Sequence, residues 1–259
     1  MSAATGPLVF AHRGSSAALP EHTLAAYERS IADGADGLEC DVRLTRDRQP
    51  VCIHDALIDR TSNGRGRVSE CTLAELSKLD FAPGTGSPAG ILTLDRFFTA
   101  ALDAARPLQL LIETKHPSRF GGAVEEAVVE VLVRHGLASA AGATERGVFA
   151  TVMSFSALAL RRMRVLAPEV PTVFLFDIGP KAVWEGRTPF GADALGPGIK
   201  ALRGRPDLVR RAHDRGHRVY VWTVNTAADI RLVVDLGVDG IITDRPVDVL
   251  AMLGRRPPR

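Results

Sequence analysis

The stretch DGADGLECDVRL, residues 33–44, is the part of the sequence that decides the fold. It joins the end of a helix-like segment, residues 23–33, to an eight-residue strand-like run, Gly37–Leu44. A glycine just past a helix can adopt the left-handed conformation, and a second glycine lets the strand begin tightly. A similar phrase, LGVDG, stands at residues 236–240 between another helix-like segment and another apolar run. Similar helix-to-strand turns at distant points are typical of a barrel built from like βα units.

Outward from this stretch, short apolar runs alternate with longer amphipathic segments. The strand-like runs are 8–11, 37–44, 109–114, 147–155, 171–177, 192–199, 218–224 and 239–243. The helix-like segments are 23–33, 94–105, 123–135, 157–166, 206–215, 227–236 and 247–253, and no element is predicted for 180–190. Strands that alternate with helices predict a parallel α/β sheet. Eight repeats in about 250 residues favour a closed (β/α)8 TIM barrel over an open doubly wound sheet.

Residues 55–93 break this alternation. They contain two stretches rich in glycine, serine and proline, residues 61–67 and 82–90, around one short helix near residues 73–79. This segment is expected to be a loop insertion after the second strand, with too few apolar residues for a core of its own. The sequence therefore predicts one barrel domain over residues 1–254 and a disordered tail over residues 255–259.

Composition places the chain among globular proteins. Of its 259 residues 46% are apolar and 24% charged, and the net charge is only +2, with three of the positive charges in the last five residues. This balance predicts no basic face for nucleic acid or anionic lipid. We expect neither a membrane span nor a signal peptide, and the odd count of three cysteines favours reduced thiols in the cytoplasm. No feature of the sequence indicates an oligomeric state.

Acidic residues gather where the predicted strands end. In the strand 37–44, Glu39, Asp41 and Arg43 share one face, which points inward in a barrel. Glu113 and Lys115 share a face at the C-terminal end of another strand, which is the end where barrel active sites form. Buried carboxylates are costly unless they are paired or bind a metal, and oxygen ligands suit Mg²⁺ or Ca²⁺. The alternatives are a solvated acidic edge strand and a simple Glu–Lys pair at a strand end.

Two histidines also stand at the ends of apolar runs. His12 follows residues 8–11 and His54 follows residues 51–53. Such a pair suits acid and base catalysis near neutral pH, although a single strand-end histidine can equally be a hydrogen-bonded rim residue. Arg13 offers a planar fork for a phosphate, and Gly14 allows a close backbone approach. The other five histidines are expected to lie mostly at the surface.

Seven motifs in order resemble the glycerophosphodiester phosphodiesterases, and the likeness spans nearly the whole chain. They are HRG (12–14), PEHT (20–23), ECDV (39–42), VCIHD (51–55), ETK (113–115), WTVN (222–225) and GIITDRP (240–246). The resemblance implies a barrel with an insertion after the second strand. It also implies that one divalent cation, Mg²⁺ or Ca²⁺, binds to Glu39, Asp41 and Glu113.

The resemblance further implies a catalytic pair and a substrate site. The catalytic histidines would be His12 and His54, with Arg13 and Lys115 on the phosphate. Trp222 resembles the family's aromatic wall for the alcohol or glycerol, although ordinary barrel packing explains it equally well. Glu21 stands where the family also has an acid, and His22 replaces the family's asparagine, so the role of that amide does not carry over.

The expected activity is the metal-dependent hydrolysis of a small-molecule glycerophosphodiester to glycerol 3-phosphate and an alcohol. One histidine would act as base and the other as acid, and the nucleophile would be water or the neighbouring glycerol hydroxyl. A phospholipase D-like enzyme acting on lysophospholipid or sphingomyelin is an alternative. A barrel that only binds phosphate-containing metabolites is a second. A Schiff-base enzyme using Lys115 is a weaker third, because nearby carboxylates favour the charged amine.

Overall fold

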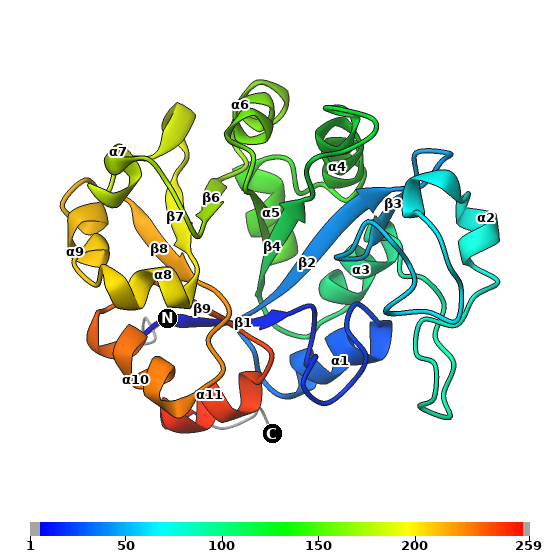
Figure 1. The fold of residues 1–259 in the computed structure, drawn as a ribbon, viewed down its shortest axis with the longest axis horizontal. Helices are drawn as coiled ribbons and strands as arrows, with labels where there is room; N and C mark the ends of the chain where they lie inside the picture. The colour runs from blue at the N-terminus through cyan, green and yellow to red at the C-terminus, as the bar shows by residue number, and fades with distance from the viewer. Residues whose placement is uncertain (1–5, 256–259) are drawn as a thin grey trace.

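The predicted alternation of strands and helices closes into a barrel (Figure 1). The structure is a computed structural model that describes residues 6–255. Over this range the parallel strands of the wall are β1 (Leu8–His12), β2 (Gly37–Leu44), β4 (Leu108–Thr114), β5 (Val148–Ser154), β6 (Thr172–Phe176), β7 (Ala194–Pro197), β8 (Arg218–Val221) and β9 (Gly240–Thr243). Strand β1 pairs with both β9 and β2, so the wall is closed. The prediction of a (β/α)8 TIM barrel is confirmed.

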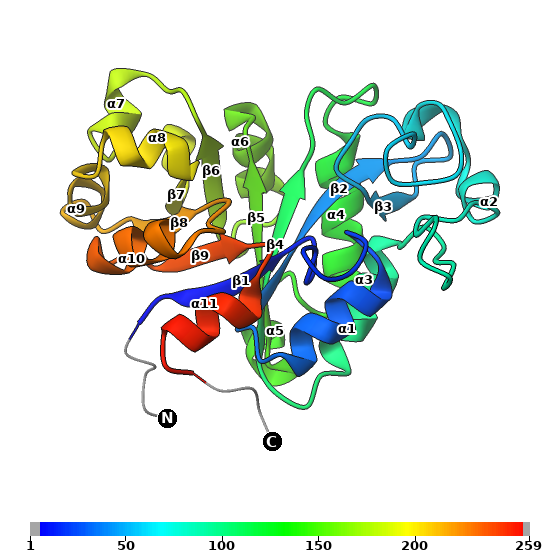
Figure 2. The ribbon, with the colours of Figure 1, turned by 60° about the horizontal axis from the view of Figure 1, so that its bottom comes forward.

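Helices surround this wall in Figures 1 and 2. They are α1 (Leu24–Ala32), α3 (Leu94–Leu102), α4 (Ala123–Arg134), α5 (Ala140–Arg146), α6 (Ala157–Leu166), α7 (Lys181–Trp184), α8 (Ile199–Gly204), α9 (Leu208–His213), α10 (Ala227–Asp235) and α11 (Pro246–Met252), with a 3-10 turn η2 (Pro189–Gly191). Helices α5 and α8 were not predicted. Each has at most seven residues, which is too few for a clear hydrophobic period.

The two glycine-containing turns have a physical explanation. Gly34 and Gly237 lie in the left-handed region, with φ of 88° and 72°. The second glycine of each phrase leaves room for the ring of Phe10 inside the barrel. A Cβ atom would lie 2.6 Å from that ring at Gly37 and 3.0 Å from it at Gly240. The repeated phrase therefore fixes both the helix end and the width of the barrel interior.

Strand β2 shows how the barrel separates its core from its site. Its even-numbered residues, including Leu38 and Val42, are fully buried and pack against Phe97 of helix α3 in the layer between strands and helices. Its odd-numbered residues Glu39 and Asp41 point to the other face, as the alternation predicts. The apolar contacts of one face thus hold the carboxylates of the other in place.

The insertion after the second barrel strand lies at the right-hand side of Figures 1 and 2. It follows β3 (Pro50–Cys52), which runs antiparallel to β2, and contains the turn η1 (Val68–Glu70) and helix α2 (Leu73–Leu76). The expectation that it lacks a core is wrong in part. A small apolar cluster is formed by Val51, Ile53, Ile58, Val68, Leu76 and Phe81. Strand β3 supplies Val51, and Ile53 follows directly after the strand, so the insertion is anchored to the barrel.

Of the tail 255–259, for which disorder is predicted, the structure describes only Arg255. Its guanidinium forms an ion pair with Asp36, including a contact of 2.7 Å between Nη1 and Oδ2. Residues 256–259 lie outside the described residues. Within residues 6–255, no helix is both long enough and apolar enough to cross a membrane.

Candidate active site

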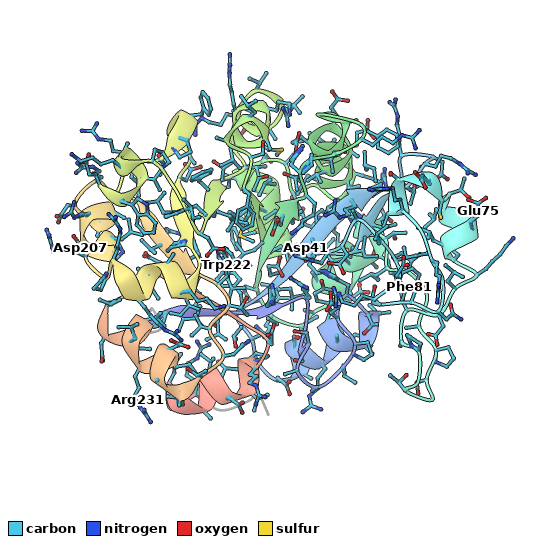
Figure 3. The ribbon with its side chains drawn as sticks, viewed as in Figure 1. Asp41, Glu75, Phe81, Asp207, Trp222 and Arg231 are labelled. Carbon is cyan, nitrogen blue, oxygen red and sulfur yellow. The ribbon has the colours of Figure 1, made fainter. Side chains whose placement is uncertain are left out.

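A small cavity lies at the C-terminal ends of the barrel strands, and Trp222, labelled near the middle of Figure 3, is one of the residues that line it. Its volume is about 110 Å³. The charged and polar residues that line it are His12, Arg13, Glu39, His54, Glu113 and Lys115. Strands β1, β2 and β4 and the loops after β1 and β3 bring these residues together from distant parts of the chain. With Asp41, which lies against them, they include every predicted catalytic, phosphate-binding and metal-ligating residue.

Three carboxylates form the floor of this cavity. One oxygen from each of Glu39, Asp41 and Glu113 lies within 4.8 Å of the others, and all three side chains are buried. Burial and the neighbouring charge of Asp41 raise the pKa of Glu113 to about 8 and that of Glu39 well above its usual value. Burial acts against ionisation of Asp41 too, but the hydrogen bond from His22 and the charge of Lys115 hold its pKa well below its usual value.

The donor set fits a hard divalent cation. Burial first, and the charge of Asp41 second, raise the pKa of Glu39 and of Glu113, and a bound cation would favour the ionised form of both carboxylates. All the donor atoms are oxygens, which Mg²⁺ and Ca²⁺ prefer. The one lysine at the cluster compensates only in part: Lys115 Nζ lies 2.7 Å from Glu113 Oε1 and 3.2 Å from Asp41 Oδ1.

Arg13 is held in a left-handed turn directly after β1. Its φ is 57°, and its backbone N–H donates to Glu39 Oε2 at 3.0 Å. The following Gly14 packs so closely on helix α1 that a Cβ atom there would lie 2.7 Å from the Cβ of Ala26. The guanidinium Nη1 donates to Glu21 Oε1 at 3.1 Å, while Nε lies 3.1 Å from Asp41 but makes no aligned hydrogen bond. The fork is thus fixed at the cavity with hydrogen-bonding capacity left over.

His12 is oriented by a residue from the other end of the chain. Its Nδ1 lies 2.6 Å from Asp244 Oδ1, just after β9. Ser16 and Asn225 also donate to this carboxylate, at 3.0 Å and 2.5 Å. Although burial opposes the change, the hydrogen bond and charge of His12 lower the pKa of Asp244 to about 2. An ionised Asp244 fixes the proton on Nδ1, so Nε2 is the free nitrogen.

His54 also pairs with an aspartate, Asp55, but this aspartate forms an ion pair with Arg60 as well. Its Nδ1 lies 2.7 Å from Asp55 Oδ1, and the other oxygen of Asp55 accepts from Arg60 Nε at 2.6 Å. Arg60 continues to Glu21 through two contacts of 2.7 Å, and Glu21 accepts from Arg13. Burial lowers the pKa of His54, and the charges of Lys115 and Arg13 act in the same direction. Arg60 of the inserted segment therefore links His54, through Asp55 and Glu21, to Arg13, the residue next to His12.

The expectation that the remaining histidines lie mostly at the surface is wrong for His22. Its side chain is 5% exposed, with Nε2 at 2.9 Å from Asp41 Oδ2 and Nδ1 at 2.7 Å from the hydroxyl of Tyr27. The hydroxyl of Tyr27 also contacts the backbone oxygen of Glu39 at 3.0 Å. His22 thus steadies Asp41 from behind. Its loop context in the sequence gave no sign of this position.

An apolar side faces the charged one. Trp222 follows β8 and donates from Nε1 to the backbone oxygen of Gly196 at 2.8 Å, which fixes the ring. Phe155 packs edge to face against it, with 5.3 Å between ring centres, and is 45% exposed. Met153 and Leu175 complete this side of the cavity. Trp222 thus both lines the cavity and packs against neighbouring side chains, a position compatible with either of the uses predicted for it.

Two residues that support the histidines were not predicted: Asp244, the partner of His12, and Arg60, the partner of Asp55. Asp244 stands within one of the matched motifs but is 232 residues from His12, and no local spacing pairs them. Arg60 lies in the irregular insertion, where no periodic pattern marks a functional side chain. The only available signals were the position of Asp244 at the end of an apolar run and that of Asp55 beside His54.

Comparisons with known proteins agree with this geometry. The sequence model of the Glycerophosphoryl diester phosphodiesterase family matches residues 12–248. A probable glycerophosphodiester phosphodiesterase 1 of Mycobacterium tuberculosis is 45% identical, over 93% of this chain and 90% of the relative. A glycerophosphodiester phosphodiesterase of Caldanaerobacter subterraneus subsp. tengcongensis is 34% identical, over 95% and 97%.

A solved structure is similar over the whole barrel. It is a phosphodiesterase from Oleispira antarctica in complex with the product sn-glycerol-3-phosphate. The TM-score is 0.81 and the sequence identity 25%, over 96% of this chain and 97% of that one.

Proposed function

Because the chain belongs to the glycerophosphoryl diester phosphodiesterase family and is an enzyme of that class, we propose that it hydrolyses glycerophosphodiesters at the C-terminal end of its barrel. The products would be glycerol 3-phosphate and an alcohol. The observation that carries this proposal is the pair of histidines, His12 and His54, each held by an aspartate, in one cavity with three carboxylates. The product complex of the Oleispira antarctica relative supports the same substrate class.

The cofactor of this proposal is one divalent cation, Mg²⁺ or Ca²⁺. Glu39, Asp41 and Glu113 would hold it, since each offers an oxygen to a common point. When bound, such a cation supplies Lewis-acid polarisation of the phosphate. Arg13 and Lys115 would bind the phosphate oxygens and stabilise the charge that grows on them, the main term expected in phosphoryl transfer.

The partners of the two histidines favour different roles for them. Asp244 accepts from neutral groups besides His12, so it keeps its full charge beside the imidazole, and this arrangement favours His12 as the base. Asp55 is already paired with Arg60 and shares its charge with it, so we assign His54 the other role, proton donation to the leaving alcohol. The nucleophile is water or the neighbouring glycerol hydroxyl, and detection of a cyclic phosphate would distinguish them.

The direct test is product analysis. Incubation with glycerophosphocholine and Mg²⁺ or Ca²⁺ is expected to release glycerol 3-phosphate and choline. Incubation with lysophosphatidylcholine or sphingomyelin is expected to release no choline. Choline from the lipids alone would instead support the phospholipase D-like alternative, and binding without any turnover would support a binding protein.

Removal of the cation should have the largest effect on this activity. Chelation is expected to abolish hydrolysis, and added Mg²⁺ or Ca²⁺ should restore it, because the three carboxylates repel one another without a cation. The measurement is the rate of glycerol 3-phosphate release before and after dialysis. A rate that survives complete chelation would contradict the metal part of the proposal while leaving the hydrolytic part intact.

The free thiols Cys40, Cys52 and Cys71 support a reducing compartment such as the cytoplasm.

A further inference from the structure

A second cavity, of about 80 Å³, adjoins the active site and is lined by positive charge. We propose that this cavity binds a phosphate group carried by the alcohol part of the substrate. The inference rests on the proposed function and names a substrate class for it: glycerophosphodiesters whose alcohol is itself phosphorylated. The charged residues of the lining are Arg43, Arg67, Lys115 and Arg119, and no acidic residue lines it.

Three separate parts of the chain build this cavity. Arg43 extends from β2 two residues beyond Asp41, on the face that the sequence analysis placed inward, where its role was left unassigned. Arg67 comes from the insertion, immediately before η1. Arg119 follows Lys115 in the loop after β4, with Ser69 and Ser118 adding hydroxyl groups. Their convergence is a property of the fold, since no motif in the sequence unites them.

Among the described residues, three of the four positive charges of this cavity have no ion-pair partner, whereas Lys115 is paired with Glu113 and Asp41. Within the described residues, no carboxylate oxygen lies within 4.0 Å of the guanidinium of Arg43, Arg67 or Arg119. Arg43 donates from Nε to the backbone oxygen of His54 at 2.8 Å, and Arg119 reaches only the backbone oxygen of Ser69 at 3.5 Å. By contrast, the nearby Arg46 and Arg60 pair with glutamates. A phosphate would supply the missing counter-charge in a geometry that guanidinium forks match.

The cavity is on the side of the active site from which the alcohol would leave. Lys115 lines both cavities, so the two share a wall. Arg43 is hydrogen-bonded to His54, the proposed proton donor to the leaving alcohol. A phosphate on that alcohol could therefore reach Arg43, Arg67 and Arg119 while the phosphodiester lies against Arg13 and Lys115. The apolar side formed by Trp222 and Phe155 offers such a group no cationic partner.

The experiment compares two substrates that differ by one phosphate: glycerophosphoinositol and glycerophosphoinositol 4-phosphate. We expect kcat/KM to be about tenfold higher for the phosphorylated compound at low salt. The variants Arg67→Gln and Arg119→Gln should each reduce this ratio about threefold, and the double variant should bring it close to one. Both residues are exposed, so their replacement spares the core, and thermal melting checks the fold. Arg231→Gln, on the outer face of α10 in Figure 3, is the matched control and should keep the ratio.

Salt provides a second measurement that needs no variant. When NaCl is raised from 0.05 to 0.5 M, the ratio of kcat/KM for the phosphorylated over the unphosphorylated substrate should fall several-fold for the unmodified enzyme. Salt screens the attraction between the added phosphate and the exposed arginines. Equal kcat/KM for the two substrates at low salt would overturn the inference and leave the proposed function standing. Equal loss of both activities in the arginine variants would overturn it too, since it would show a structural role. Hydrolysis of neither substrate would overturn both proposals.

Discussion

The two ends of the barrel both carry carboxylates but use them differently. At the N-terminal end, aspartates just before a strand accept a backbone N–H of the neighbouring strand at 2.7–2.8 Å. These residues are Asp36, Asp193 and Asp239. At the C-terminal end, Glu39, Asp41 and Glu113 face one another instead. A carboxylate that accepts backbone N–H groups completes the fold, whereas carboxylates that repel one another need a further partner.

The size of a cavity does not identify the active site. A cavity of about 510 Å³ at the N-terminal end, lined by Gln109, Thr151, Arg218 and Tyr220 among others, and one of about 560 Å³ after β6 are both several-fold larger than the catalytic one. Among the described residues, the one cluster of acids able to hold a metal lies at the catalytic cavity. The arrangement of charges therefore locates the active site better than volume does, in agreement with the position of active sites in TIM barrels.

Among single substitutions, removal of a histidine at the C-terminal end should have the largest effect on activity, and it tests whether that end carries the chemistry. His12→Ala and His54→Ala are each expected to lower kcat by roughly 10²–10⁴-fold, the usual range for a positioned acid or base. The measurement is steady-state hydrolysis of glycerophosphocholine, with thermal melting as a check on the fold. Near wild-type turnover in either variant would remove that histidine from the mechanism.

Most of the fold could be predicted because the barrel repeats one pattern. The alternation of apolar runs and the phrases at 33–37 and 236–240 express local rules of helix ends and strand faces. Helices α5 and α8 were missed because seven residues or fewer carry little periodic signal. The small core of the insertion could not be predicted from residues 55–93 alone, because Val51 of β3 and the following Ile53 contribute to it.

The site was predictable where a strand end delivers the side chain. His12, Asp41 and Glu113 each stand at or near such an end, and the alternation of faces gives their direction. Asp244 and Arg60 could not be paired with the histidines from spacing, because only barrel closure and the path of the insertion bring them there. His22 could not be placed either, since a backbone φ of 58° turns it inward.

A smaller effect is expected at Asp244, which lies at the C-terminal end but touches no substrate. Asp244→Asn should lower kcat/KM about 10–100-fold, because the amide no longer fixes the tautomer of His12. The loss should fall on kcat while KM stays within about twofold, a split that a merely structural role would not cause. The control is Asp239→Asn at the other end, which should leave kcat within about twofold. A loss confined to KM, or no loss, in Asp244→Asn would contradict the positioning role.

The smallest effect is expected at the N-terminal end, where Asp239→Asn should change stability and not catalysis. Asp239 Oδ2 accepts from the backbone N–H of Val219 at 2.8 Å and from His213 at 2.9 Å, so the loss of its charge should lower the free energy of unfolding by about 1–2 kcal/mol. Urea unfolding measures this value, and kcat should stay within twofold. Asp214→Asn removes an exposed carboxylate paired with Arg210 and should cost less than about 0.5 kcal/mol. If Asp239→Asn instead lost activity at unchanged stability, carboxylates at this end would not be structural, and the contrast between the two ends would fail.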